Sequence, residues 1–153
     1  MRAVTTERAD LLDLGRYAFG RLRTRLAGLS EEEYRWEPGP GVSALAWRLG
    51  HIVDLLTEER NAAWLGVEAR PSPARTPITA RDALEALDAA IAVWLDEVDA
   101  VPEQTWGDPI GPVGGPYADS SRRAFALHIL DELIHHGAEV ALVRDLWAAR
   151  SAS

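Results

Sequence analysis

Cysteine is absent from this 153-residue chain. The protein can therefore form no disulfide, offer no thiolate to a metal ion and use no cysteine nucleophile. Any thiol chemistry has to use a small thiol supplied from outside the protein.

Lysine is also absent, and the formal net charge is −8 at pH 7. A nucleic-acid-binding surface needs a concentrated basic face, whereas the 16 arginines here are spread along the chain. The densest run, residues 21–25, alternates arginine with leucine and threonine, and we interpret it as the solvated face of a helix. We expect no nucleic-acid partner.

Long hydrophobic runs are missing as well. No segment reaches the about 18 uncharged apolar residues that a membrane-spanning helix needs, and the N-terminus lacks the apolar core of a signal peptide. We therefore expect no membrane association and a cytoplasmic location. The length and the 47% apolar content suit one domain with one core, spanning residues 1–153.

Apolar residues recur with helical periodicity in four stretches, and no stretch alternates as a β-strand does. The expected helices span about 6–27, 43–65, 79–98 and 119–149, with Ser43 and Thr79 as N-caps of the second and third. A capping pattern, Ser30-Glu31-Glu32-Glu33, opens a short turn before the second helix. The prediction is an all-α four-helix bundle with a long crossover connection.

Two further proline-containing segments follow the second and third helices. Residues 66–78, with three prolines, are expected to form the crossover loop. Residues 107–118 are rich in glycine and proline but match no phosphate-binding pattern. We interpret them as a surface loop, with a flap over a site as the alternative.

The last helix places a carboxylate and an imidazole within or at the edge of its apolar stripe. Glu132 and His136 are four residues apart, so their side chains lie one above the other on one helix face. A buried carboxylate needs a cation or hydrogen-bond donors to offset its desolvation. Either a metal ion or a purely structural His–Glu ion pair would meet this need.

His51, on the flank of the apolar stripe of the second helix, is the leading candidate to complete a site. Two imidazoles and one carboxylate form the His₂Glu composition of catalytic zinc sites, which keep a further position open. Sequence separation alone does not bring His51 to Glu132 and His136. The donor types favour a divalent metal, with zinc or nickel the best match.

The remaining polar residues near this set receive secondary roles. His135 faces away from the apolar arc and could pair with Asp131 at the surface, whereas His128 could supplement or replace a ligand. Glu132 and His135 also form one E-x-x-H element, but a di-iron site needs two such elements and the sequence has one. Possible proton shuttles for a hydrolase are Asp54, Glu58 and His135.

Two segments, GVSALAWRLGHIVDLL (41–56) and LHILDELIHHGAEVALVRDLW (127–147), resemble the DinB superfamily of metal-binding four-helix bundles. More narrowly, they resemble the metal-binding domain of actinobacterial mycothiol-dependent maleylpyruvate isomerases. That resemblance implies His51, Glu132 and His136 as metal ligands. Many DinB proteins have histidine where this chain has Glu132, and the mycothiol branch has the same E-x-x-x-H pattern. The larger isomerases carry a further C-terminal domain, and the likeness here is to their metal-binding domain alone.

Three functions remain open from the sequence. In the first, a bound metal activates a small thiol, such as mycothiol, against a small electrophilic substrate, giving a transferase or isomerase. In the second, the metal activates water and the protein is a hydrolase. The third is a non-catalytic bundle that binds a metal or small ligand. Apolar positions exposed on the first and last helices predict a homodimer.

Overall fold

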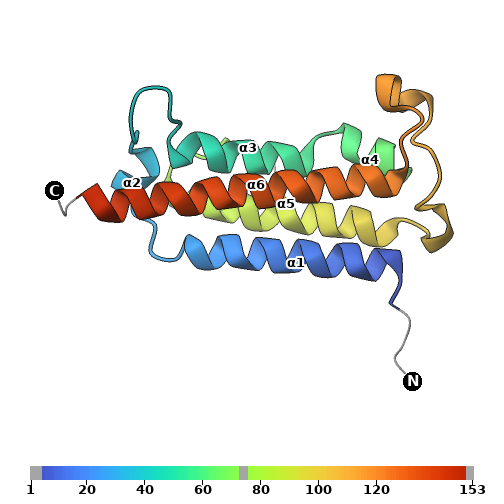
Figure 1. The fold of residues 1–153 in the computed structure, drawn as a ribbon, viewed down its shortest axis with the longest axis horizontal. Helices are drawn as coiled ribbons and strands as arrows, with labels where there is room; N and C mark the ends of the chain where they lie inside the picture. Colours follow the sequence, from blue (N-terminus) through green and yellow to red (C-terminus); the bar gives the residue numbers. More distant parts are fainter. Residues whose placement is uncertain (1–4, 73–75, 151–153) are drawn as a thin grey trace.

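The computed structural model describes residues 5–72 and 76–150, and the described part is helical without strands (Figure 1). The predicted all-α class is therefore confirmed. The long helices are α1 (Glu7–Arg25), α3 (Leu45–Thr57), α5 (Ala80–Ala100) and α6 (Arg122–Ala149). Shorter elements are α2 (Glu31–Arg35), α4 (Arg60–Leu65) and the 3₁₀ helices η1 (Glu103–Thr105) and η2 (Pro112–Tyr117).

The four long helices pack as a bundle in which α1 and α3 are each in contact with both α5 and α6. Ion pairs at both ends of α1, Glu7 with Arg123 and Arg25 with Asp145, show that α1 and α6 run parallel. The pair Arg23–Asp88 and the contact of Arg8 with Asp99 make α5 antiparallel to α1.

Contacts between α3 and α6 show the opposite relation to that of α1 and α6. Arg48 pairs with Glu139, and three residues later His51 lies against His136, so α3 is antiparallel to α6. Since α5 is also antiparallel to α6, α3 and α5 run parallel. Consecutive parallel helices require a long connection from one end of the bundle to the other, and residues 66–79 supply it, with 73–75 outside the described residues.

Caps explain where several helices begin. Thr79 is the N-cap that the sequence predicts for α5, and with Asp82 it forms a complete capping box. The Ser30 hydroxyl likewise accepts a hydrogen bond from the Glu33 N–H. The Glu33 carboxylate, however, does not return to the cap. It accepts two hydrogen bonds from Arg144 of α6, at 2.6 and 3.0 Å, and so ties α2 to the last helix.

The expectation of one helix over residues 43–65 is wrong. Glu58 adopts an extended backbone (φ −54°, ψ 132°), which separates α3 from α4. The buried Asn61 side chain donates a hydrogen bond to the Leu55 carbonyl and thereby replaces part of the lost helical bonding. The apolar residues keep their helical spacing across Glu58, so the apolar pattern alone does not reveal the break.

Two expected helix starts also shift. α3 begins at Leu45 after Ala44, which makes no side-chain capping bond, so Ser43 is not the cap. α6 begins at Arg122, with the Ser121 hydroxyl accepting from the Ala124 N–H, slightly later than the expected start at 119 or 120. These shifts are of one to three residues at the first residue of a helix, where boundaries are least certain.

The core fills the space between the four long helices. Its largest fully buried side chains are aromatic and aliphatic, and they include Trp94, Trp106, Leu45, Leu49, Ile52, Leu56, Leu87, Ile129, Leu130 and Leu133.

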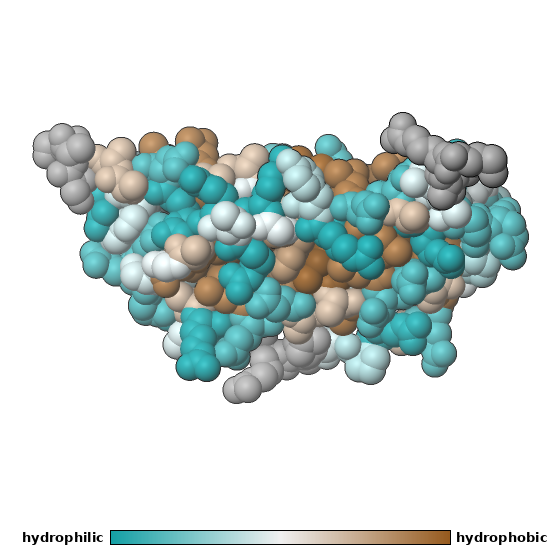
Figure 2. All heavy atoms as spheres, turned by 90° about the horizontal axis from the view of Figure 1, so that it is seen from below, coloured by the Kyte–Doolittle hydropathy of each residue, from teal (hydrophilic) through white to brown (hydrophobic). Residues whose placement is uncertain are grey.

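No helix in the described ranges is long and apolar enough to cross a membrane. The surface seen from the α1 side is mainly hydrophilic, with hydrophobic atoms grouped along its middle (Figure 2). The homodimer stays a prediction, and the large apolar side chains exposed on α1 and α6 are Leu14, Tyr17, Leu127, Leu142 and Leu146.

Glu97 on α5 is buried, and it accepts a hydrogen bond from the Arg70 backbone N–H at 3.3 Å. Burial raises the pKa of Glu97, and the Arg70 hydrogen bond and charge only partly oppose it. The folded state therefore binds the proton more tightly than the unfolded chain does. The free energy of unfolding should fall as the pH rises from the ordinary glutamate pKa through the raised pKa of Glu97.

Glu97→Gln keeps the acceptor for Arg70 and removes the charge. We expect this variant to be more stable than the wild type at neutral pH, with the difference shrinking as the pH falls through the raised pKa, measured by urea unfolding at several pH values. Glu33→Gln is the contrasting control, because it weakens the Arg144 ion pair. It should lose stability at neutral pH, up to the about 3–5 kcal/mol seen when a buried pair loses one partner. A Glu97→Gln advantage that does not change with pH would contradict the explanation.

Candidate metal centre

The antiparallel contact of α3 and α6 brings together the three residues that the sequence singled out. One donor atom each from His51, Glu132 and His136 lies within 4.8 Å of the others. Nε2 of His136 is 3.3 Å from Oε2 of Glu132, and the His51 and His136 rings meet edge to face with centroids 4.5 Å apart. The three side chains therefore converge on one point between the helices.

Local sequence explains how these side chains reach the interior. On α6, Leu133 and Val140 are fully buried beside the set, and Leu49 and Ile52 are buried beside His51 on α3. His136 is 9% exposed as a residue, and the Glu132 side chain 28%. The set thus lies at the edge of the core, buried from one side and reachable from the other.

Glu139 orients the His136 ring. Its Oε2 is 2.9 Å from Nδ1 of His136, so Nδ1 is engaged and Nε2 is left facing Glu132. A carboxylate on the far nitrogen of a histidine fixes the ring and its tautomer, as commonly occurs behind metal-bound imidazoles. Glu139 is not among the site residues predicted from the sequence, although its spacing of three residues from His136 was a usable signal.

Arg48 in turn balances the charge of Glu139. The two side chains form an ion pair across α3 and α6, and Arg48 Nε also donates to the Ser43 carbonyl at 3.2 Å. Partial burial would raise the pKa of Glu139, but the His136 hydrogen bond and the Arg48 charge outweigh it and lower that pKa. Glu139 is therefore a charged group that Arg48 balances.

A second group of donors, His135, His136 and Glu139, is also close enough to hold an ion. It is the weaker candidate because Arg48 already balances the Glu139 carboxylate. His135 is exposed, stacks on His136 with ring centroids 4.6 Å apart, and lies 3.4 Å from Glu139. The expected pairing of His135 with Asp131 is thus replaced by pairing with Glu139.

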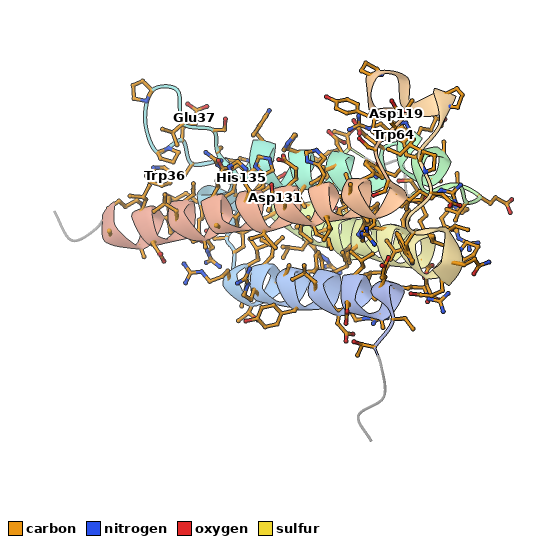
Figure 3. All side chains as sticks on the ribbon, turned by 45° about the vertical axis from the view of Figure 1, so that its right-hand side comes forward. Trp36, Glu37, Trp64, Asp119, Asp131 and His135 are labelled. Atoms are coloured by element: carbon orange, nitrogen blue, oxygen red, sulfur yellow. The ribbon has the colours of Figure 1, made fainter. Side chains whose placement is uncertain are left out.

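The other candidates lie outside the central set. His128 is exposed one turn before Glu132, and Asp54 and Glu58 are exposed on the α3 side. Glu58 forms an ion pair with Arg60. Figure 3 shows Asp131 and His135 along the middle of α6, whereas Trp64 lies at the end of the bundle near Asp119.

The chemistry of the set fits a divalent cation. It offers two imidazole nitrogens and one carboxylate oxygen, which zinc and nickel accept. Within the described residues, the only ion-pair partner of Glu132 is His136, whose ring is charged only when protonated. Trp47, exposed and stacked on His51 with centroids 5.1 Å apart, covers one side of the set.

The chain belongs to the DinB superfamily, whose sequence model matches residues 16–140. Among solved structures, it is similar to the crystal structure of a conserved protein from Enterococcus faecalis, with a TM-score of 0.63 and 15% sequence identity over 92% of this chain and 96% of that one. At that identity the likeness supports the fold alone. No curated protein matches the chain.

Variants of three histidines test which donors hold a metal. Replacing His51 or His136 with Ala should remove zinc from the purified protein, while His135→Ala should retain most of it, measured by elemental analysis after dialysis. Circular dichroism would confirm that each variant is folded. Equal loss from His135→Ala would instead assign the ion to the group formed by His135, His136 and Glu139.

The orienting role of Glu139 is tested separately. Glu139→Ala should weaken zinc affinity about 10–100-fold, the usual effect of removing a carboxylate behind a metal-bound histidine. Glu139→Gln keeps an acceptor and should recover part of that affinity. Competition with a chromophoric chelator gives the affinities, and Glu85→Ala, which breaks an exposed ion pair with Arg81, is the matched control. Unchanged affinity in Glu139→Ala would rule out the orienting role.

Proposed function

We propose that the protein is a divalent-metal-dependent enzyme that uses a small thiol as nucleophile or cofactor, in a transferase or isomerase reaction. The convergence of His51, Glu132 and His136 at the edge of the core is the observation that carries this proposal. Three protein donors leave coordination positions of a tetrahedral or larger shell available to an external molecule.

When bound, a divalent ion on one carboxylate and two neutral imidazoles would supply a local charge of about +1, which favours the thiolate form of a small thiol near neutral pH. The chain itself contributes position and access. Glu139 and Arg48 hold the His136 ring, and the buried residues beside the set keep water away from its inner side.

Two properties of the sequence support the thiol over other nucleophiles. The chain has no cysteine, so no protein thiol competes for the ion or traps the small thiol as a mixed disulfide. The Glu132-x-x-x-His136 pattern is also the one by which the chain resembles mycothiol-dependent isomerases. Mycothiol is accordingly the first thiol to test, with a small electrophile as its partner.

A hydrolase is less well supported by the arrangement of possible bases. Glu58 is engaged by Arg60 and His135 by Glu139, and Asp54 is exposed outside the central set. The remaining alternative is a bundle that binds a metal or small ligand without catalysis, and it is an outcome of the test below.

The test is conjugation of mycothiol, and of other small thiols, to a chlorinated nitroarene by metal-loaded protein. We expect a rate above that of the thiol alone, lost on chelation and in Glu132→Ala. Each unit by which the thiol pKa falls corresponds to about 1.4 kcal/mol of thiolate stabilisation. An exposed-surface variant, Arg81→Gln, should keep the full rate.

Unchanged conjugation rates across a panel of thiols and electrophiles, with the metal shown to be bound, would contradict the thiol-dependent reaction. Hydrolysis of esters or amides under the same conditions would then favour a hydrolase. Inactivity in both assays would favour the non-catalytic bundle.

A further inference from the structure

A cavity of about 450 Å³ lies at the end of the bundle where α4 and the segment carrying η2 meet the first turns of α6. This volume is within the range of small-molecule sites. The cavity exists because the chain breaks at Glu58 and re-forms a helix as α4, while the glycine- and proline-rich segment closes the other side.

Aromatic rings form much of the cavity wall. The Trp64 ring lies 4.9 Å from Phe125 and 5.8 Å from Tyr117, measured between centroids, and Ile110 adds an aliphatic surface. Phe125 is buried, whereas Tyr117 is 59% exposed and stands at the edge. Such walls favour a planar apolar molecule, since ring faces and edges pack against another π-system.

One cation marks the polar side of the cavity. Arg60 lies with its guanidinium carbon 4.8 Å from the Trp64 ring centroid and pairs with Glu58. Both partners of that pair are close to half exposed, and exposed ion pairs contribute little to stability. Arg60 can therefore turn to a ligand carboxylate at small cost, and guanidinium groups bind carboxylates through two parallel hydrogen bonds.

The cavity borders the metal-binding candidates through His128. This residue lines the cavity and lies on α6 one turn before Glu132, so the two side chains are neighbours on one helix face. A molecule held against Trp64 and Phe125 in this cavity would thus lie along the α6 face that leads to His51, Glu132 and His136.

We propose that this cavity binds a small aromatic carboxylate, with its ring packed against the wall formed by the Trp64, Tyr117 and Phe125 side chains and its carboxylate on Arg60. Its role as the electrophilic co-substrate rests on the proposed thiol-dependent function. Binding of the carboxylate does not depend on that function, so binding can be measured on protein from which metal has been removed.

The binding experiment uses 2-naphthoate as the probe, followed by calorimetry on metal-free protein. 2-Naphthylmethylamine carries the same ring with the opposite charge, and cyclohexanecarboxylate carries the charge without the π-system. We expect 2-naphthoate to bind more tightly than both. Arg60→Gln should weaken it about tenfold, the worth of one charged hydrogen bond, and Tyr117→Ala should weaken it as well.

Arg150→Gln is the matched control, because Arg150 also lies over a tryptophan, Trp147, but at the other end of α6. It should bind 2-naphthoate as the wild type does. Tyr117 is exposed, so its replacement tests the aromatic wall without disturbing the core. No measurable binding of 2-naphthoate, or equal binding by Arg60→Gln and the wild type, would overturn the proposal.

The co-substrate role has its own readout. With 4-chloro-3-nitrobenzoate, a thiolate sulfur forms the new bond to the ring carbon and chloride leaves with its electron pair. Arg60→Gln should raise KM for this carboxylate but not for uncharged 1-chloro-2,4-dinitrobenzene. If 2-naphthoate binding depends on Arg60 while neither compound reacts, the cavity assignment stands and the thiol-dependent function fails.

Discussion

The antiparallel contact of α3 with α6 is the constraint on which the candidate site depends. Helix α6 carries Glu132 and His136 in one turn, but His51 reaches them only because α3 runs against α6 at that level. The Arg48–Glu139 ion pair lies one turn away in the same contact. The register that packs the two helices therefore also assembles the donor atoms.

Two carboxylates at the contacts of α6 each have a guanidinium partner: Glu33 is paired with Arg144, and Glu139 with Arg48. Glu132 has no arginine among its described partners and faces two imidazoles instead. If these side chains only stabilised the bundle, an ion pair between Glu132 and His136 would be sufficient. A divalent cation would instead be bound by His51, Glu132 and His136 together.

The break between α3 and α4 shapes the cavity at one end of the bundle. A continuous helix would carry Trp64 onward along the α3 axis. The extended residue Glu58 and the buried Asn61 instead re-direct the chain, so that Trp64 packs against Phe125 and Tyr117. The resulting aromatic cavity borders His128, one turn from Glu132, which places a candidate ligand site beside the candidate metal site.

Sequence by itself determined the helical class, the N-cap at Thr79 and the shared helix face of Glu132 and His136, because these depend on residues within one or two turns. It also pointed to His51 by composition and resemblance. Only the tertiary structure decided that His51 meets the pair, that Glu139 rather than Asp131 partners His135, and that α3 ends at Thr57. Those outcomes depend on contacts between segments distant in the chain, and apolar periodicity carries no information about which helices lie side by side or where a buried side chain such as Asn61 interrupts them.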